Sequence, residues 1–496
     1  MTVAQTTLGV LRGKTGITQF RGIPYATAER FRPPVPITMW SGVRDARRDG
    51  PVAPQPSARQ LHTSGMAMAV QDETCLSLSI ATPAMPPSAD LAAADPDFSL
   101  RPVLVFIHGG GYATGAGSSD IYDPAIVCAD SDLVVVKLNY RLGALGFLCL
   151  PDLAEGNMGL LDIIAALRWV QAHIARFGGD PRNVTVMGHE TGAHAIMCLL
   201  TMWDSQGLFH RAILASCPIG VTPQSRETAR QNAIQLCESA GVEATELVGL
   251  SAAQIVAAQS KLVRSARRFA DVEMSFMPMF EDLHGHNDPT RFIAAAAKAA
   301  AVRAIHLMIG TTREEMHAIL AIDNAMLPPS PLAIANRFTE VTGSADTITL
   351  YRHRRAGGRD YDLLGDLMTD HLFLFPSLDL AEALTVAGGQ AWVYQFDWAP
   401  RGSPMRACQG IDLACLFGIA GNWAETEMLK DADPDEFSSI GSALRAAFGE
   451  FAHTNDPDAP GLPWPPYRQA NRITMRFDTA LGPVGDLAGA GWRWGG

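Results

Sequence analysis

Two glycine-containing segments carry the residues of this chain that could do chemistry. In VLVFIHGGGY, at 103–112, a β-branched run leads into three consecutive glycines. Glycines let backbone N–H groups point into a cavity, where such donors stabilise a negative oxygen atom. In VTVMGHETG, at 184–192, a strand-like run meets two glycines that flank Glu190. This is the frame of a nucleophile elbow, a strained strand-to-helix turn, with glutamate where the elbow usually has serine.

The elements that must position these segments alternate along the chain. Helical periodicity is expected over 160–177, over 193–200 and over the alanine-rich stretch 294–301. β-branched runs predict strands at 103–107, 133–138, 184–187, 212–215, 306–309 and 392–396. This alternation predicts an α/β protein with a mostly parallel sheet and helices on both faces.

One further segment bears on domain organisation. Residues 83–102 are rich in Pro, Ala, Asp and Ser, which is typical of a surface loop between two strands rather than of a linker. We therefore interpret 1–496 as one domain with a loop insertion at 83–102.

Composition excludes several classes of function. The chain has 496 residues, 47% of them hydrophobic and 18% charged, so it can bury a large core. Its net charge of −12 argues against binding to nucleic acid or to an anionic membrane. No apolar run reaches the roughly 18–20 residues that span a bilayer, and the N-terminus has no secretory pattern. A cytoplasmic protein with eight buried free thiols is the expectation.

Many short segments resemble the type-B carboxylesterases, the family that includes the cholinesterases. The resemblance extends along nearly the whole chain and implies an α/β-hydrolase fold, with a central, mostly parallel, twisted sheet. It is carried in order by FRGIPYA (20–26), RFRPP (30–34), DETCL (72–76), HGGGY (108–112), NYRLGALGFL (139–148), NMGLLD (157–162), FGGDP (177–181), FAHTNDP (451–457) and WPPY (464–467).

The resemblance also implies a catalytic triad in the chain order serine, acid, histidine. Glu190 stands at the serine position. Glu315 matches the acid in GTTREE, although Met316 replaces the usual following glycine. Gln409 stands at the histidine position in QGIDLACLFG. Because loss of the serine or the histidine of such a unit costs about 10⁶-fold in turnover, ordinary acyl-enzyme hydrolysis is not expected.

The resemblance places an oxyanion hole on the backbone N–H groups of Gly110, Gly111 and Thr191. His189, where the family usually has a glutamate, and Tyr112 are candidates to line the pocket. No metal motif or nucleotide-binding glycine pattern is present, so no metal and no cofactor are expected.

Other nucleophiles are poor candidates. The Thr191 side chain is expected to point away from the hole. Ser118 and Ser119 lie after the glycines and are interpreted as polar loop residues, and His194 is expected to be buried structure. Several aromatic residues could line a pocket, but we favour a core position for each: Phe373, Phe375, Trp398 and Trp423.

Two effects compete on the Glu190 carboxyl group. Burial favours the neutral acid, which could donate a proton, whereas N–H donors and a helix N-terminus favour a carboxylate that occupies the hole. The Gln409 amide can pair with either form, because it both donates and accepts. Glu315 is expected to hydrogen-bond the Gln409 amide and hold it in place.

Three hypotheses remain open. In the first, Glu190 is the general acid/base of a non-hydrolytic step on a hydrophobic small molecule: isomerisation, epoxide rearrangement, elimination or cyclisation. In the second, the protein is an esterase with an atypical triad, in which Glu190 activates water or forms an acyl anhydride. In the third, it is an inactive relative that only binds a ligand.

Overall fold

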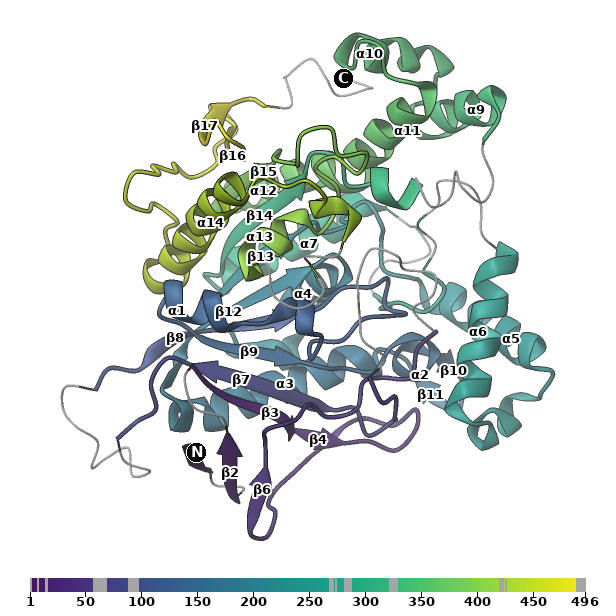
Figure 1. The fold of residues 1–496 in the computed structure, drawn as a ribbon. Helices are drawn as coiled ribbons and strands as arrows, with labels where there is room; N and C mark the ends of the chain where they lie inside the picture. The colour runs from purple at the N-terminus through teal and green to yellow at the C-terminus, as the bar shows by residue number, and fades with distance from the viewer. Residues whose placement is uncertain are drawn as a thin grey trace.

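A ten-stranded sheet runs through the middle of the protein, with helices packed on each side of it (Figure 1). The structure is a computed structural model, and it describes residues 2–6, 9–13, 17–56, 69–87, 98–266, 272, 274–280, 288–320, 329–418, 423 and 426–487. The strand order is β17-β16-β15-β14-β13-β12-β8-β9-β7-β3. From β9 through β16 the neighbours are parallel, and the flanking strands are antiparallel.

The predicted strands are all present in this sheet, most of them longer than the sequence indicated. Their bounds are β3 (Thr18–Pro24), β7 (Ser77–Thr82), β8 (Arg101–Ile107), β9 (Val134–Leu138), β12 (Gly179–His189), β13 (Arg211–Ala215), β14 (His306–Thr312), β15 (Ala391–Phe396), β16 (Ile473–Phe477) and β17 (Gly482–Gly485). Short strands lie outside the main sheet: β1 (Thr2–Thr6), β2 (Gly9–Gly13), β4 (Ala26–Thr27), β5 (Val35–Pro36), β6 (Val43–Asp45), β10 (Cys149–Leu150) and β11 (Ala154–Glu155).

The predicted helices are also present, although the last four residues of the stretch predicted at 160–177 form a 3-10 turn instead of α-helix. The α-helices in the described part of the chain are α1 (Ala125–Asp130), α2 (Gly143–Phe147), α3 (Met158–His173), α4 (Thr191–Thr201), α5 (Arg226–Ala240), α6 (Ala252–Ala266), α7 (Pro289–Val302), α9 (Pro331–Thr342), α10 (Ile348–Arg354), α11 (Asp360–Thr369), α12 (Phe375–Val386), α13 (Ile411–Phe417) and α14 (Pro434–Thr454).

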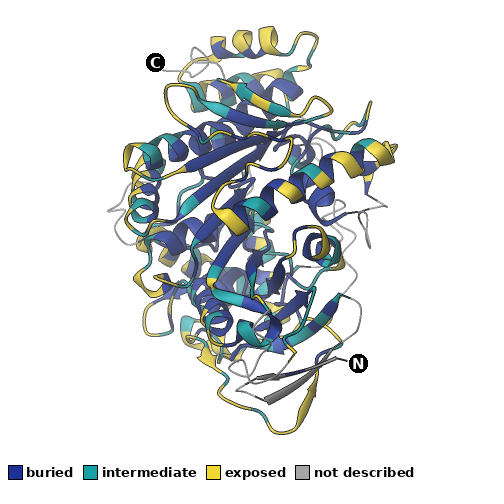
Figure 2. Ribbon diagram, turned by 90° about the vertical axis from the view of Figure 1, so that its left-hand side faces the viewer, coloured by how far each residue is buried: buried dark blue, intermediate teal, exposed yellow. Residues whose placement is uncertain are grey.

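Side chains of the central strands alternate between two hydrophobic cores, one on each face of the sheet. On β8, Val103, Val105 and Ile107 belong to the core that includes α3, α4 and α7. Leu104 and Phe106 belong to the core that includes α1, α13 and α14. Because the side-chain period of a strand is two, this alternation requires helices on both faces, and the predicted α/β class is confirmed. Figure 2 shows the strands buried between helices whose outer positions are exposed.

The segment 83–102, expected to be a surface loop, follows β7, and its last two residues belong to β8. β7 ends at Thr82 and β8 begins at Arg101, so the described parts of 83–102 are irregular up to that point. Residues 88–97 of this loop lie outside the described part of the chain. The single-domain interpretation of 1–496 stays a prediction.

One helix departs from the expectation that no stretch is long and apolar enough to span a membrane. Met158–Phe177, which comprises α3 and the 3-10 turn η4 (Ile174–Phe177), passes that test by length and composition, with 20 residues. A search for uninterrupted apolar runs does not find this helix, because Asp162 and Arg168 separate its apolar residues. However, 72% of its apolar window is buried inside the protein, and Asp162 forms an ion pair of 2.7 Å with Arg141.

The cysteines match the expectation of unpaired, buried thiols. All eight are free and buried: Cys75, Cys128, Cys149, Cys198, Cys217, Cys237, Cys408 and Cys415.

Candidate active site

Glu190 stands in a strained turn between a central strand and a buried helix. β12 ends at His189 and α4 begins at Thr191, and Glu190 between them has φ 52° and ψ −120°. A positive φ is costly for a residue with a Cβ, and strain of this kind is concentrated at functional sites. The Glu190 N–H donates to the carbonyl of Ala215 on the next strand at 2.9 Å. The elbow predicted from the sequence is therefore present.

The two glycines of the elbow are required by close packing. A Cβ on Gly188 would overlap the backbone of Ala193, and a Cβ on Gly192 would overlap the carbonyl of Ile107 at the end of β8. Gly192 therefore lets α4 approach β8, which brings the elbow next to the three glycines that follow that strand.

One oxygen of the Glu190 side chain occupies the predicted oxyanion hole. Oε2 accepts hydrogen bonds from the N–H groups of Gly110, at 2.5 Å, and Gly111, at 3.0 Å. The hydroxyl of Thr191 donates to the same oxygen at 2.8 Å. Positive φ angles at Gly110 (124°), Gly111 (62°) and Tyr112 (55°) turn the loop so that these N–H groups face the elbow. The protein's own carboxyl group thus occupies the donors that were predicted to form the oxyanion hole.

The third donor of the hole differs from the expectation. The backbone N–H of Thr191 was expected there, with the Thr191 side chain pointing away from the hole, and this expected side-chain orientation is wrong. Thr191 is fully buried at the first position of α4, where its hydroxyl lies between the Glu190 carboxyl group and the Tyr112 N–H, which donates to it at 3.4 Å. The hydroxyl is the Thr191 group that contacts Oε2.

The second oxygen of Glu190 remains available. Oε1 accepts no hydrogen bond from any residue that the structure describes, and Glu190 as a whole is only half-buried. The side chain is therefore fixed through Oε2, while Oε1 is left for a ligand or solvent.

Tyr112 supports the loop rather than lining a pocket. Its side chain is fully buried, and its hydroxyl is 2.8 Å from Nδ1 of His194, whose Nε2 is 3.0 Å from the carbonyl of Val221. Its ring packs edge-on against Phe147. The expectation that Tyr112 is a pocket residue is therefore corrected, and His194 is buried structure as predicted.

Glu315 and Gln409 come from adjacent segments but do not pair. Glu314 donates from its backbone N–H to the carbonyl of Ala407 at 3.0 Å, which brings the two segments together. Oε1 of Glu315 accepts from the N–H of Thr312 at 2.7 Å. Oε2 of Glu315 and Nε2 of Gln409 are both buried without a partner among the described residues, so the expected hydrogen bond between them is wrong. The bond to Thr312 holds the carboxyl group against its own strand.

The buried acid at 315 has a strongly shifted titration. Burial and the charge of Asp412 together raise the pKa of Glu315 to about 8, although the Thr312 N–H acts to lower this pKa. Glu315 is therefore largely a neutral acid near pH 7. A neutral carboxyl group can donate a proton, whereas the carboxylate of a serine-type triad accepts a hydrogen bond from histidine.

His189 is the imidazole beside Glu190. It is half-buried at the end of β12, and its Nε2 has no partner among the described residues. Burial lowers the pKa of His189, and the charges of Asp412 and Glu190 oppose that effect. His189 is thus a neutral imidazole near pH 7 whose Nε2 has no partner among the described residues, and its assignment as a pocket residue stays a prediction.

Two residues near the site were missed by the sequence analysis. Asp412 is buried in the first turn of α13, where Tyr394 donates to its Oδ2 at 3.3 Å, and burial raises its pKa. The sequence feature that could have identified Asp412 is its place as the acid in QGIDLACLFG, the segment that contains Gln409. Gln55 holds the far end of the oxyanion loop, since its amide accepts from the N–H of Gly115 at 2.9 Å and donates to the carbonyl of Gly115 at 3.0 Å. No sequence pattern marks Gln55.

The remaining candidate residues from the sequence lie in the loop after the glycines or in the hydrophobic core. Ser118 hydrogen-bonds the side chain of Asn139, at 3.3 Å, as expected of a polar loop residue. The four aromatic candidates are all buried in the core: Phe373, Phe375, Trp398 and Trp423. Within the described part of the chain, no group of three or more His, Cys, Asp or Glu residues is arranged to hold a metal ion.

A family model and several known proteins are similar to this chain over nearly its whole length. The model of the Carboxylesterase family matches residues 2–485. A probable N-octanoylanthranilate hydrolase from Rhodococcus erythropolis is 33% identical over 485 residues, which cover 96% of this chain and 97% of the relative. The para-nitrobenzyl esterase of Bacillus subtilis (strain 168) is 32% identical over 495 residues, covering 97% of this chain and 95% of that protein.

Solved structures show the same similarity. A thermophilic pNB esterase superposes with a TM-score of 0.81 at 29% identity, covering 99% of each chain. The Geobacillus stearothermophilus carboxylesterase EST55 superposes with a TM-score of 0.82 at 28% identity, covering 99% of this chain and 100% of the other.

Proposed function

The chain belongs to the carboxylesterase family and has the α/β-hydrolase fold, and from this premise we propose that it performs a non-hydrolytic acid/base step on a hydrophobic small molecule. Glu190 is the general acid/base of that step. Isomerisation, epoxide rearrangement, elimination and cyclisation are the reactions that one positioned carboxyl group suits.

The proposal assigns Glu190 and Gln409 to the positions of the serine and histidine of an esterase triad. The strained elbow supports the first assignment, because the catalytic residue of such a turn stands at its centre. The alignment of QGIDLACLFG with the family pattern supports the second. Glu190 has no hydroxyl and Gln409 cannot titrate, so the nucleophile and base of acyl-enzyme hydrolysis are both missing.

The observation that carries the proposal is the unequal use of the two Glu190 oxygens. Oε2 is fixed by Gly110, Gly111 and the Thr191 hydroxyl, whereas Oε1 has no hydrogen bond from any described residue. Donors in this arrangement stabilise negative charge on the oxygen that they contact. A carboxylate held in one orientation needs no reorganisation before it takes a proton through Oε1.

The filled hole restricts the chemistry. Because Oε2 occupies the donors, a substrate carbonyl cannot use them while Glu190 stays in place. Reactions that develop an oxyanion in the hole are therefore disfavoured. Proton removal by Oε1 followed by elimination or isomerisation fits the site best.

Two other functions remain candidates, each with its own support. The relatives named above are called a hydrolase and an esterase, which favours an atypical ester hydrolase in which Glu190 activates water. The occupation of the hole by the Glu190 side chain favours the hypothesis that the protein is an inactive relative, which binds a hydrophobic ligand without turnover.

A base-sensitive probe tests the proposal without knowledge of the natural substrate. In 5-nitrobenzisoxazole, a base removes the ring C–H proton, the N–O bond breaks, and a coloured cyanophenolate forms. We expect the chain to accelerate this ring opening, and Glu190→Gln to reduce the acceleration by about 10²-fold or more. Glu340→Gln, an exposed position on α9, is the matched control. Equal rates for Glu190→Gln and the unmodified chain would reject Glu190 as the base.

A further inference from the structure

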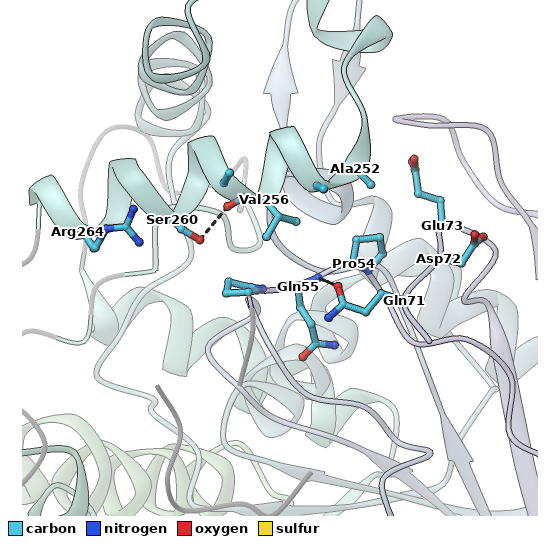
Figure 3. A pocket seen from close by; sticks show the side chains of 12 residues that line it. Pro54, Gln55, Gln71, Asp72, Glu73, Ala252, Val256, Ser260 and Arg264 are labelled. Atoms are coloured by element: carbon cyan, nitrogen blue, oxygen red, sulfur yellow. Dashed lines mark hydrogen bonds between the residues drawn. The ribbon is translucent and has the colours of Figure 1, made fainter. Parts of the chain in front are cut away.

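A cavity of about 690 Å³ lies apart from Glu190, between α6 and the segments that contain Pro54 and Asp72 (Figure 3). Small-molecule sites in proteins usually enclose about 300–1,000 Å³. Neither the sequence analysis nor the family relationship assigned a role to this cavity. Its volume is sufficient for a ligand of moderate size.

The cavity is long and has an apolar wall. Ala253, Val256 and Ala257 lie on one face of α6, opposite Pro54 and Pro56. The helical residues that line it extend from position 252 to position 264, which corresponds to roughly 18 Å along a helix at 1.5 Å per residue. Ala253 and Ala257 are exposed and Val256 is half-buried, so a ligand here would cover apolar surface.

Most polar groups of the wall already have partners. The N–H of Gln55 donates to Oε1 of Gln71 at 3.0 Å, and the hydroxyl of Ser260 donates to the carbonyl of Val256 at 2.8 Å. Glu73 forms an ion pair with the guanidinium of Arg30, which is not one of the residues that line the cavity. Because these groups already have hydrogen-bond or ion-pair partners within the protein, they need no polar ligand to satisfy them.

Arg264 differs from them. It is exposed, and it forms no hydrogen bond or ion pair with any described residue. In Figure 3 its guanidinium lies at one end of the cavity, and Asp72 lies at the opposite end. An anionic group would be attracted to Arg264, whereas a second anionic group at the far end would meet the carboxylate of Asp72.

We propose that this cavity is a binding site for an elongated amphiphile with a single carboxylate. The carboxylate pairs with Arg264, and the alkyl chain lies along Val256 and Ala257 toward Pro54. The site is separate from Glu190 but close to its support, because Gln55 lines the cavity and also hydrogen-bonds Gly115 of the oxyanion loop.

Calorimetric titration of the full chain with sodium decanoate tests the site. Ala257→Trp fills the cavity, and we expect it to weaken the Kd roughly tenfold or more. Arg264→Gln removes the charge, and we expect a loss of about fivefold, the upper range for an exposed ion pair. The matched controls are Ala294→Trp and Arg291→Gln, exposed positions on α7 that should bind decanoate like the unmodified chain.

Decyltrimethylammonium, with the same chain length and the opposite charge, tests the assignment of the carboxylate. It should bind at least about fivefold more weakly than decanoate. In Arg264→Gln, the Kd values of the two amphiphiles should lie closer together than in the unmodified chain. The proposal is wrong if decanoate does not bind, if both cavity variants bind it within about twofold of the unmodified chain, or if the cationic amphiphile binds equally well. None of these readouts depends on Glu190, so failure of this site leaves the proposed acid/base function standing.

Discussion

Oε2 of Glu190 lies 2.5 Å from the backbone nitrogen of Gly110, so the side chain at the elbow fills the predicted oxyanion hole from within. In a serine esterase the hole must be open, because the tetrahedral intermediate places its oxygen there. Here the residue at the centre of the elbow and the donors that face it form one fixed unit.

Truncation of Glu190 should open the hole to an external anion. In Glu190→Ala, the N–H groups of Gly110 and Gly111 lose their partner, and a small carboxylate can replace it. We expect butyrate to bind Glu190→Ala with a millimolar Kd by calorimetry and to give no heat with the unmodified chain. Glu190→Gln is the control, because its side chain still fills the hole. Butyrate binding that persists in Arg264→Gln, which keeps Glu190 but lacks the proposed cavity cation, would show that Glu190 does not block the donors.

Loss of Gln55 should destabilise the oxyanion loop. The buried amide of Gln55 satisfies both the N–H and the carbonyl of Gly115. Gln55→Ala leaves these groups without that partner, and we expect it to reduce the free energy of unfolding by about 1–3 kcal/mol in urea melts. Gln231→Ala, at an exposed site on α5, should change it by less than about 0.5 kcal/mol. Equal stabilities of the two variants would contradict the supporting role of Gln55.

A Cβ at Gly192 should be far more costly than one at an uncrowded glycine. Gly192→Ala would push α4 away from the carbonyl of Ile107, and we expect a loss of about 3 kcal/mol or more. Gly249→Ala is the control, since nothing lies within 4 Å of the position its Cβ would take. The measurement is the urea midpoint of each variant. A small and equal effect of both substitutions would mean that the elbow does not need close contact between α4 and β8.

The pKa of Glu315 predicts a specific dependence of stability on pH. Burial raises this pKa from 4.5 to about 8, so the folded state keeps a proton that the unfolded state releases between these values. Stability from this group is therefore fully present below about pH 4.5 and is lost as the pH rises toward 8. Relative to Glu315→Gln, the free energy of unfolding of the unmodified chain should fall by up to about 1.4 kcal/mol per pH unit in this window.

Urea melts of the unmodified chain and of Glu315→Gln at several pH values provide that comparison. The difference in their free energies of unfolding isolates the titration of Glu315, because all other groups are shared. Parallel pH profiles across the window would show that the carboxyl group titrates normally despite its burial.

The sequence predicted the framework of the site because the framework depends on local patterns. The strands were marked by β-branched runs, and the elbow was marked by Gly188 and Gly192, whose spacing is set by close packing. The type of residue at 190 could be read directly. The contacts of its carboxyl group could not, because they depend on where the glycine loop after β8 passes the elbow.

The details that the sequence missed depend on contacts between distant segments. Gln55 reaches Gly115 across 60 positions of the chain and belongs to no motif. The failure of Glu315 to pair with Gln409 follows from the rotamer that Thr312 imposes on the acid. The orientation of the Thr191 hydroxyl likewise depends on where the glycine loop passes α4. None of these follows from residue type or spacing.

The central claim is that Glu190 fills the hole of an esterase scaffold and replaces its serine, with Gln409 in place of the histidine. Hydrolysis of p-nitrophenyl butyrate by the unmodified chain and by the Glu190→Ser/Gln409→His double variant tests it most directly. The account predicts that the unmodified chain is inert and that the double variant turns the ester over. It is contradicted if the unmodified chain hydrolyses the ester at a rate that Glu190→Gln abolishes, since Glu190 would then be a hydrolytic residue.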